Sequence, residues 1–370
     1  MNFYELAQPG VRGLTPYQPG KPIEELEREL GLSNILKLAS NENPLGPSPE
    51  GLAAAQAALA GVELYPDGSG FALKAALSAK LGVAAEQITL GNGSSEVLEF
   101  AARVFVAAEH EVVFSQHSFA LYPIFTQIIG AKAVVTPAAQ WGHDLDAMRR
   151  AITPRTRLIF IANPNNPTGT WVGGAALESF IRDLPPQVMV VVDEAYFEYA
   201  SHAGMGAADY PNTLAWVNRY PNLIVARTFS KCYGLAGLRV GYAVSHPDVA
   251  DLMNRLRPPF NVGSVALAAA TAALGDEAHL QRTLSTNADG MRQLTAAFNE
   301  RGLAYIPSVG NFICVDVDQP AGPLYDALLR KGVIVRPVAN YGLPNHLRVT
   351  VGTAEQNAVF LRVLDEVLAA

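Results

Sequence analysis

The sequence predicts an α/β fold in which a large domain, built on a mostly parallel sheet flanked by helices, carries a smaller α+β domain. From about residue 65, short apolar runs alternate with helical stretches, the order expected when crossover helices join parallel strands. Most runs are continuously apolar, as expected for strands covered on both faces. The predicted strands are residues 88–90, 111–114, 132–136, 158–161, 188–192, 223–226 and 239–244.

The two ends of the chain follow other patterns. The first 20 residues are rich in proline and glycine and predict an extended arm, and residues 22–30 predict a short helix that Gly31 ends. After about residue 255 the smaller domain is expected to begin. Its predicted elements are a helix from 264, a long polar helix over 276–302, strands at 312–317 and 333–336, and a helix after 347–352.

Length and composition limit the class of protein. A chain of 370 residues is expected to form two domains. We assign 1–30 to an arm and short helix, 61–259 to the large domain, and 31–60 with 260–370 to the small domain. The net charge is −7 without a basic block, so neither nucleic acid nor an anionic membrane is an expected partner.

Cysteine use and hydropathy predict a cytoplasmic location. The two cysteines, Cys232 and Cys314, show no CxxC spacing, which excludes a disulfide framework and fits a reducing compartment. The longest apolar stretch, residues 265–274, is too short to cross a membrane, and the N-terminus lacks the features of a signal peptide.

Polar segments follow most of the predicted strands directly. They are residues 91–95, 116–117, 163–169, 193 and 228–231. In open α/β sheets, ligands bind outside the carboxyl ends of the strands, so these segments predict one shared site.

Lys231 is the most informative of these residues. It follows the apolar strand 223–226, where partial desolvation would lower its pKa and free the amine to form a Schiff base with a carbonyl. Thr228, Ser230 and Arg239 lie nearby in sequence and suit a phosphate group. An imine-forming lysine beside a phosphate cradle indicates pyridoxal 5'-phosphate, which carries both an aldehyde and a phosphate.

Three further segments fit this cofactor. Residues 91–96 join a strand to a helix, and their backbone could hold an anion at the helix N-terminus, although a plain cap by Ser94 or Ser95 is the alternative. The run Asn163–Gly169 has two prolines that restrict the backbone and can fix Asn166 at the strand end, where an amide could donate to the cofactor's phenolic oxygen; an Asx-rich turn is the alternative.

Asp193 and Tyr196 form the third segment. A carboxylate that ends so apolar a strand must face a cation, and the protonated ring nitrogen of the cofactor is one; an ion pair within the protein is the alternative. Tyr196, three residues on, can reach the phenolic oxygen.

Taken together, these motifs resemble the fold-type I aminotransferases that depend on pyridoxal 5'-phosphate. The resemblance to the histidinol-phosphate aminotransferase family is closer and runs from about Pro16 to the C-terminus. It is carried by residues 40–44, 65–67, 91–96, 163–169, 193–196, 230–239 and 347–352.

The resemblance implies a role for each matching residue. Lys231 would bind the cofactor and move the proton between the substrate's Cα and the cofactor's C4'. Asp193 would pair with the ring nitrogen, and Asn166 and Tyr196 with the phenolic oxygen. The phosphate would be held by Ser230, Arg239, Thr228 and the backbone of Gly93, Ser94 and Ser95.

The resemblance also implies a homodimer with shared active sites, in which Tyr65 reaches the neighbouring subunit's cofactor phosphate. Tyr17, Asn166 and Arg336 would contact substrate, and Arg348 would clamp the carboxylate of glutamate or 2-oxoglutarate. No metal site is expected, because the histidines show no ligand spacing.

Two positions depart from the family pattern. Where a tyrosine commonly stacks on the cofactor ring, the sequence offers His117, with Phe119 and Tyr122 as alternatives. Ser95 stands where Asp or Asn is frequent, a change that a backbone N–H contact would tolerate.

The implied reaction is transamination between L-histidinol phosphate and 2-oxoglutarate, a step of histidine biosynthesis. An aromatic amino-acid aminotransferase remains open, because tyrosine and phenylalanine are also flat-ringed amines. A phosphothreonine-type decarboxylase is a further alternative, since the same cofactor can stabilise the carbanion left by CO2. A DNA-binding regulator on this fold would need an added domain and a basic patch, which the sequence lacks.

Overall fold

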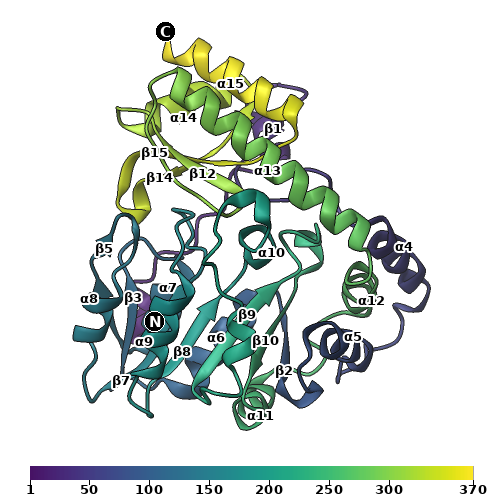
Figure 1. Ribbon diagram of the computed structural model, residues 1–370, viewed down its shortest axis with the longest axis vertical. Coiled ribbons are helices and arrows are strands. Elements are labelled where there is room, and N and C mark those ends of the chain that lie inside the picture. Colours follow the sequence, from purple (N-terminus) through teal and green to yellow (C-terminus); the bar gives the residue numbers. More distant parts are fainter. Residues whose placement is uncertain (370) are drawn as a thin grey trace.

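The computed structural model describes residues 1–369 and has two lobes of unequal size (Figure 1). A seven-stranded sheet forms the centre of the larger lobe, in the order β2-β10-β9-β8-β7-β3-β4. Only β10 runs antiparallel to its neighbours. The strands are β2 (Ile88–Asn92), β3 (Glu111–Ser115), β4 (Lys132–Thr136), β7 (Thr156–Ala162), β8 (Met189–Asp193), β9 (Leu223–Thr228) and β10 (Val240–Ser245). The predicted α/β class is confirmed, and each predicted strand of the large domain is present.

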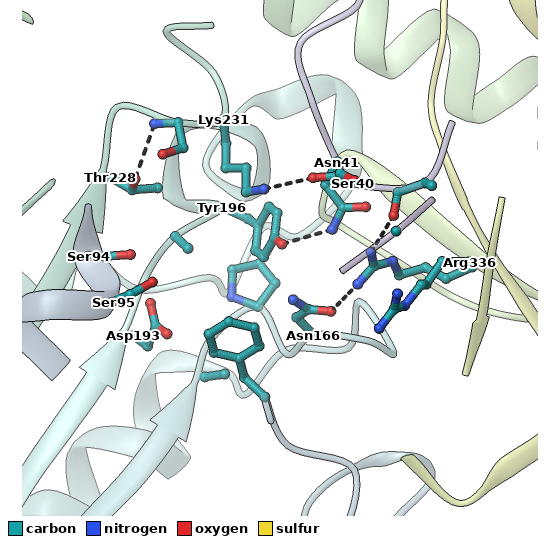
Figure 2. Close-up of a pocket in the computed structure, with 18 of the residues that line it drawn as sticks. Ser40, Asn41, Ser94, Ser95, Asn166, Asp193, Tyr196, Thr228, Lys231 and Arg336 are labelled. Carbon is teal, nitrogen blue, oxygen red and sulfur yellow. Dashed lines mark hydrogen bonds between the residues drawn. The ribbon is translucent and has the colours of Figure 1, made fainter. Parts of the chain in front are cut away.

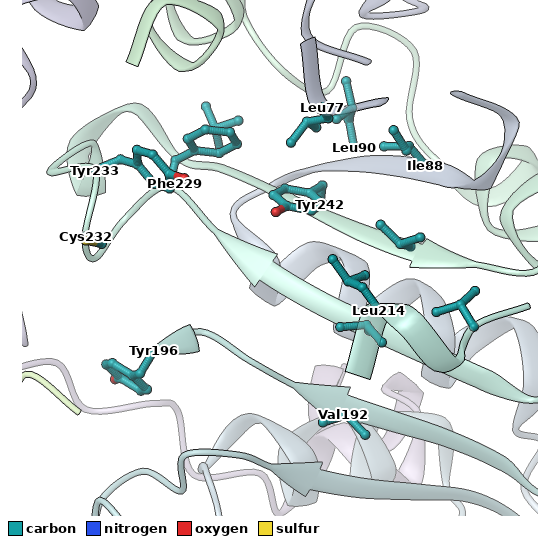
Figure 3. Packing of buried hydrophobic residues seen from close by; sticks show 14 of the residues in the cluster. Leu77, Ile88, Leu90, Val192, Tyr196, Leu214, Phe229, Cys232, Tyr233 and Tyr242 are labelled. Carbon is teal, nitrogen blue, oxygen red and sulfur yellow. The ribbon is translucent and has the colours of Figure 1, made fainter. Parts of the chain in front are cut away.

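Both faces of this sheet are covered, which explains the continuous apolar runs. Val190 and Val192 belong to one buried cluster and Val191 to another, because successive side chains of a strand point to opposite faces. Figure 3 shows part of the first cluster. That face is covered by α5 (Phe71–Leu81), α8 (Leu145–Arg150), α9 (Gly174–Arg182) and α12 (Ser264–Ala273). The opposite face is covered by α6 (Ser94–Phe105), α7 (Leu121–Ile129) and α11 (Pro247–Leu256).

The smaller lobe is a four-stranded antiparallel sheet with helices packed against it. The strand order is β11 (Tyr305–Ile306), β12 (Phe312–Asp316), β15 (Leu343–Thr350) and β14 (Arg336–Val338). Its core includes side chains of α13 (Glu277–Glu300), α14 (Ala321–Arg330) and α15 (Ala354–Leu368).

The predicted strand 333–336 is divided between two sheets. β13 (Val333–Ile334) pairs in parallel with β1 (Leu36–Lys37), whereas Arg336 begins β14 and pairs with Arg348 of β15. The apolar pattern located this strand correctly, but it carried no sign that a segment 300 residues earlier supplies its partner.

The N-terminal segment is less extended than the sequence predicted. It contains α1 (Phe3–Leu6) and α2 (Pro9–Arg12) before the chain reaches α3 (Ile23–Leu30). Asn2 caps α1 by accepting a hydrogen bond from the Tyr4 N–H, and Pro9 occupies the first turn of α2, where its missing N–H costs nothing. Gly10 lies against the backbone of Gln127 in α7, so closely that a Cβ would lie 1.9 Å from the Gln127 oxygen.

The packing of α4 (Pro49–Ala58) indicates where the boundary between the two lobes lies. Ala55 of α4 and the buried alanines of α12 belong to the same cluster as the large sheet. The long helix α13 contributes Leu280 and Leu284 to that cluster, but Leu294 and Phe298 to the core of the small lobe. We therefore propose that the two lobes divide within α13. The predicted small domain extends to residue 370, which lies outside the described residues.

The remaining short elements connect these layers. They are β5 (Ala138–Ala139), β6 (Gly142–His143), α10 (Phe197–Ala200), and the 3-10 turns 59–61, 85–87, 203–205, 213–216, 236–238 and 339–341. Among residues 1–369, no helix is long and apolar enough to cross a membrane.

Candidate active site

Four of the five predicted polar segments meet in one cavity between the two lobes, and residues 116–117 do not line it (Figure 2). Its floor lies at the carboxyl ends of β7, β8 and β9, and its other walls come from the N-terminus of α6, the arm, and the small lobe. The lining residues are Tyr17, Gly20, Ala39, Ser40, Asn41, Ser94, Ser95, Phe119, Ala162, Pro164, Asn166, Asp193, Ala195, Tyr196, Thr228, Ser230, Lys231, Arg239, Arg336 and Arg348.

Lys231 lies three residues beyond the end of β9, with its amine inside the cavity. Nζ donates a hydrogen bond to the backbone oxygen of Ser40, 2.9 Å away. Burial, reinforced by the positive charges of Arg348 and Arg239, lowers the pKa of Lys231 to about 7. A large fraction of the amine is therefore neutral near pH 7, which makes it a nucleophile and a base.

Asp193 ends β8 and is 5% exposed. Its Oδ2 accepts a hydrogen bond of 2.9 Å from the Tyr122 hydroxyl, while its Oδ1 is buried and has no partner in the described residues. Burial raises the pKa of Asp193 to about 6. A buried carboxylate oxygen without a partner is costly, so this group fits a ligand that brings a charged N–H donor.

Tyr196 and Asn166 lie where a second polar atom of the ligand could be held. The Tyr196 hydroxyl accepts a hydrogen bond of 2.8 Å from Asn41 Nδ2, which leaves its own proton free to donate. Burial raises the pKa of Tyr196 to about 12, so the hydroxyl stays protonated. Arg348 Nη1 donates to Asn166 Oδ1 at 2.6 Å and its Nη2 donates to the Ala39 oxygen at 2.8 Å.

The N-terminus of α6 forms an anion cradle with Arg239. Arg239 Nη1 donates to Ser230 Oγ at 3.2 Å, and Thr228 Oγ1 accepts from the Ser230 N–H at 3.1 Å. Gly93 has φ 80°, and a Cβ there would lie 2.3 Å from Arg239 Nη2, so only glycine lets the guanidinium approach. The free N–H groups and dipole of the twelve-residue helix α6 favour a phosphate at this point.

The arm closes another side of the cavity. The Tyr17 ring lies edge-on to Phe119, with 6.4 Å between ring centroids, and the Arg336 guanidinium lies 6.0 Å from the Tyr17 ring. Arg336 Nη2 also donates to the backbone oxygen of Gln18 at 2.5 Å. An aromatic ring beside a cation can accommodate both the flat ring and the negative group of a substrate.

Most of the predicted site residues line this cavity, and three do not. Gly93 lies behind the cradle. Tyr65 is 84% exposed and stacks on Phe260, with ring centroids 4.8 Å apart. His117 is buried beside the site, with its Nδ1 2.6 Å from the Tyr341 oxygen.

The three candidates for ring stacking therefore occupy different places. Phe119 lines the cavity, whereas His117 does not, and Tyr122 is buried beneath Asp193. The structure thus offers Phe119, among the three, as the ring that a bound cofactor would meet.

Asn41 is a site residue to which the sequence pattern assigned no role. This residue has φ 57°, is 1% exposed, and donates to Tyr196. Asparagine tolerates the left-handed region better than most residues, so the asparagines at 41 and 43 were the available signal. Residues 1–369 contain no group of three or more His, Cys, Asp or Glu side chains placed to hold a metal ion.

Comparison with known proteins gives consistent results. The family model "Aminotransferase class I and II" matches residues 33–364. The chain is 63% identical to histidinol-phosphate aminotransferase 1 of Nitrosococcus oceani over 366 residues, covering 99% of this chain and 98% of that relative. It is 58% identical to histidinol-phosphate aminotransferase 2 of Pseudomonas fluorescens, covering 100% and 99%.

A solved structure agrees over nearly the whole chain. The crystal structure of histidinol-phosphate aminotransferase from Sinorhizobium meliloti, in complex with pyridoxal-5'-phosphate, superposes with a TM-score of 0.90 at 30% identity. The match covers 98% of this chain and 97% of that one.

Proposed function

Because the chain belongs to the class I and II aminotransferase family, we propose that it transfers the amino group of L-histidinol phosphate to 2-oxoglutarate. The products are imidazole acetol phosphate and L-glutamate, and the cofactor is pyridoxal 5'-phosphate. The observation that carries the proposal is that one cavity is lined both by Lys231, whose amine has a pKa of about 7, and by Asp193, whose buried Oδ1 accepts no hydrogen bond from residues 1–369.

The residues present fit the cofactor at each of its polar groups. The unpaired Oδ1 of Asp193 suits the ring N–H, Tyr196 and Asn166 suit the phenolic oxygen, and the cradle of Arg239, Ser230 and α6 suits the phosphate. When bound, the cofactor supplies an electron sink for the negative charge left on the substrate's α-carbon.

The chain's own groups supply binding and proton transfer. Neutral Lys231 Nζ removes the α-proton of the substrate, and general base catalysis of this kind contributes about 10²–10⁴-fold to a rate. Arg348 presents a guanidinium that matches the carboxylate of glutamate or 2-oxoglutarate in a bidentate contact. Tyr17 and Arg336 would receive the imidazole ring and phosphate of histidinol phosphate. The two substrates use the site in turn.

A half-reaction tests this function. Enzyme reconstituted with pyridoxal 5'-phosphate is mixed with L-histidinol phosphate without an oxo acid, and the keto product is quantified by mass spectrometry. One equivalent of imidazole acetol phosphate per site is expected. No product from histidinol phosphate, but one equivalent of keto acid from phenylalanine or tyrosine, would instead identify an aromatic aminotransferase. Release of CO2 from a phosphorylated amino acid would identify a decarboxylase.

We further propose a cytoplasmic homodimer with shared active sites. Eight apolar side chains that are more than one-third exposed come from residues 45–71 and from Phe260, which stacks on Tyr65; exposed apolar groups of this kind suit a subunit interface. They are Leu45, Leu52, Leu59, Val62, Leu64, Tyr65, Phe71 and Phe260. Both cysteines are free and buried, which suits a reducing compartment.

Hybrid dimers test whether Tyr65 completes the neighbouring site. The variants Lys231→Ala and Tyr65→Ala are each expected to lose most activity. The two variants are unfolded, mixed and refolded together, so that some dimers contain one subunit of each. In such a hybrid dimer, one of the two sites combines an intact Lys231 with an intact Tyr65 from the other subunit. Recovery of activity toward one-quarter of the wild-type value is expected, because half of the dimers are hybrids with one intact site each. No recovery, with dimers confirmed by light scattering, would contradict a shared site.

A further inference from the structure

The Asp193 carboxylate is held from below by one side chain, Tyr122 of α7. The Tyr122 hydroxyl donates to Oδ2 at 2.9 Å, whereas Oδ1 is buried and has no hydrogen-bond partner among residues 1–369; Asp193 itself lines the cavity. This asymmetry divides the carboxylate into one oxygen that the protein has satisfied and one that a ligand can satisfy. None of the roles described above accounts for Tyr122.

Tyr122 is held in place by close packing of its ring. It is 0% exposed, and its ring stacks on Phe160 of β7 with a centroid distance of 4.4 Å and an interplanar angle of 0°. The Tyr122 ring also makes an edge-to-face contact with Phe119, with a centroid distance of 5.9 Å and an interplanar angle of 86°. Phe119 and Tyr122 are three residues apart, at the point where α7 begins with Leu121. This short segment therefore places Phe119 on the cavity wall and the Tyr122 hydroxyl against Asp193.

The Tyr122 hydroxyl keeps its proton and donates it to Asp193. Burial, and then the negative charge of Asp193, raise the pKa of Tyr122 well above its ordinary value, so the phenol does not ionise. Its hydrogen bond favours the charged form of Asp193 and opposes the effect of burial. The other influences on this carboxylate are the Ala195 backbone N–H and the charges of Glu194 and Lys231.

We propose that Tyr122 is a positioning residue that orients Asp193 and keeps it ionised, so that its free oxygen holds the cofactor's ring nitrogen in the protonated state. The inference rests on the proposed function, because it assumes that pyridoxal 5'-phosphate occupies the cavity. Tyr122 does not line the cavity, and its hydroxyl acts through Asp193.

A second buried tyrosine, Tyr199, argues against a purely structural role for the Tyr122 hydroxyl. Tyr199 is 1% exposed, and its hydroxyl makes no hydrogen bond of ordinary geometry in the described residues, although Asn311 and Cys232 lie near it. The fold therefore tolerates a buried tyrosine hydroxyl that lacks a well-formed hydrogen bond. Tyr199→Phe is accordingly the matched control for Tyr122→Phe: each variant removes one buried oxygen, but only the second removes a donor to Asp193.

The experiment measures the protonation state of the cofactor's ring nitrogen directly. Wild type, Tyr122→Phe and Tyr199→Phe are reconstituted with cofactor labelled with ¹⁵N in the ring, and the ¹⁵N chemical shift is measured at one pH. We expect the protonated signal in the wild type and Tyr199→Phe, and a shift toward the unprotonated value in Tyr122→Phe. Because a hydrogen bond to a charged group is lost, kcat should fall about tenfold or more in Tyr122→Phe while KM changes less than about threefold.

Each outcome decides the inference. A wild-type ¹⁵N signal and kcat in Tyr122→Phe, or equal shifts in both variants, would overturn it. If Tyr122→Phe does not fold, Phe160→Leu takes its place, because it removes the ring that stacks on Tyr122 but keeps the Tyr122 hydroxyl. A smaller change of the ¹⁵N chemical shift in the same direction is then expected. An unchanged ¹⁵N chemical shift would overturn the inference. A wild type that binds no cofactor would refute the proposed function itself, whereas inactivity on histidinol phosphate alone would leave the ¹⁵N result valid.

Discussion

Asp193 and Glu194 are adjacent carboxylates at the end of the same strand, and they lie in opposite chemical situations. Glu194 is 0% exposed and complete: Arg227 donates to its Oε2 at 2.8 and 2.7 Å, and Thr213 Oγ1 donates to its Oε1 at 2.6 Å. Asp193 is nearly as buried, but one of its oxygens has no hydrogen-bond partner in the part of the chain that the structure describes. Successive side chains of a strand point to opposite sides, so one carboxylate stabilises the fold and its neighbour is left for a ligand.

The difference shows what marks a functional group in this protein. Burial alone does not, because both carboxylates are buried. The functional carboxylate is instead distinguished by incomplete hydrogen bonding, because burying a charged group without hydrogen-bond partners costs free energy. Substitutions at the two positions should therefore affect different properties.

The largest effect on stability is expected from Glu194→Gln. The change leaves the Arg227 guanidinium, which is 3% exposed, without its counter-charge, and breaking a buried pair in this way costs about 3–5 kcal/mol. Chemical denaturation should show this loss, while kcat of the folded enzyme changes little. A large fall in kcat with unchanged stability would mean that the two carboxylates do not divide their roles as described.

The reverse result is expected for Asp193→Asn. Its Oδ1 accepts no hydrogen bond in the described residues, so stability should stay the same or increase as a buried charge is removed. Activity should fall about 100-fold, since a charged hydrogen bond to the cofactor is lost. Thermal unfolding of the cofactor-free protein and steady-state kinetics of the holoenzyme would measure the two effects separately.

A smaller effect, confined to low pH, is expected from a third carboxylate. Glu111 is 1% exposed, and hydrogen bonds from Thr153 and then Arg155 lower its pKa from 4.5 to about 2. Because the folded-state pKa is the lower one, ionised Glu111 stabilises the fold above about pH 4.5, and this contribution is lost as the pH falls toward 2.

Glu111→Gln should therefore reduce stability at pH 7 and flatten its decline between pH 4.5 and 2. Equilibrium denaturation at several pH values checks this. Parallel curves for variant and wild type would show that Glu111 has an ordinary pKa in the folded protein.

The sequence predicted the large sheet well because its signal is local. Continuous apolar runs ended by polar motifs identified each strand and placed Asp193, Asn166 and Lys231 at one edge. The division of 333–336 between two sheets was missed, because the pairing of β13 with β1 depends on residues distant in sequence. The two turns of helix in the arm were missed because proline and glycine were read as extended chain.

The partners within the site were harder to predict than the site itself. Whether His117, Phe119 or Tyr122 faces the cavity depends on how the turn before α7 is directed, which the sequence does not specify. Likewise, the hydrogen bond from Asn41 to Tyr196 joins residues 155 positions apart. Motif spacing identifies residue types at strand ends, but side-chain partners follow from tertiary packing.

The helix α13, whose two halves lie in different cores, has a consequence for how the molecule unfolds. At about 1.5 Å per residue, its 24 residues extend about 36 Å from the region of α4 and α12 to that of α15 (Figure 1). Loss of either core would expose one half of this helix and remove its tertiary support. The two lobes should therefore melt together in a single calorimetric transition, although each has a sheet of its own.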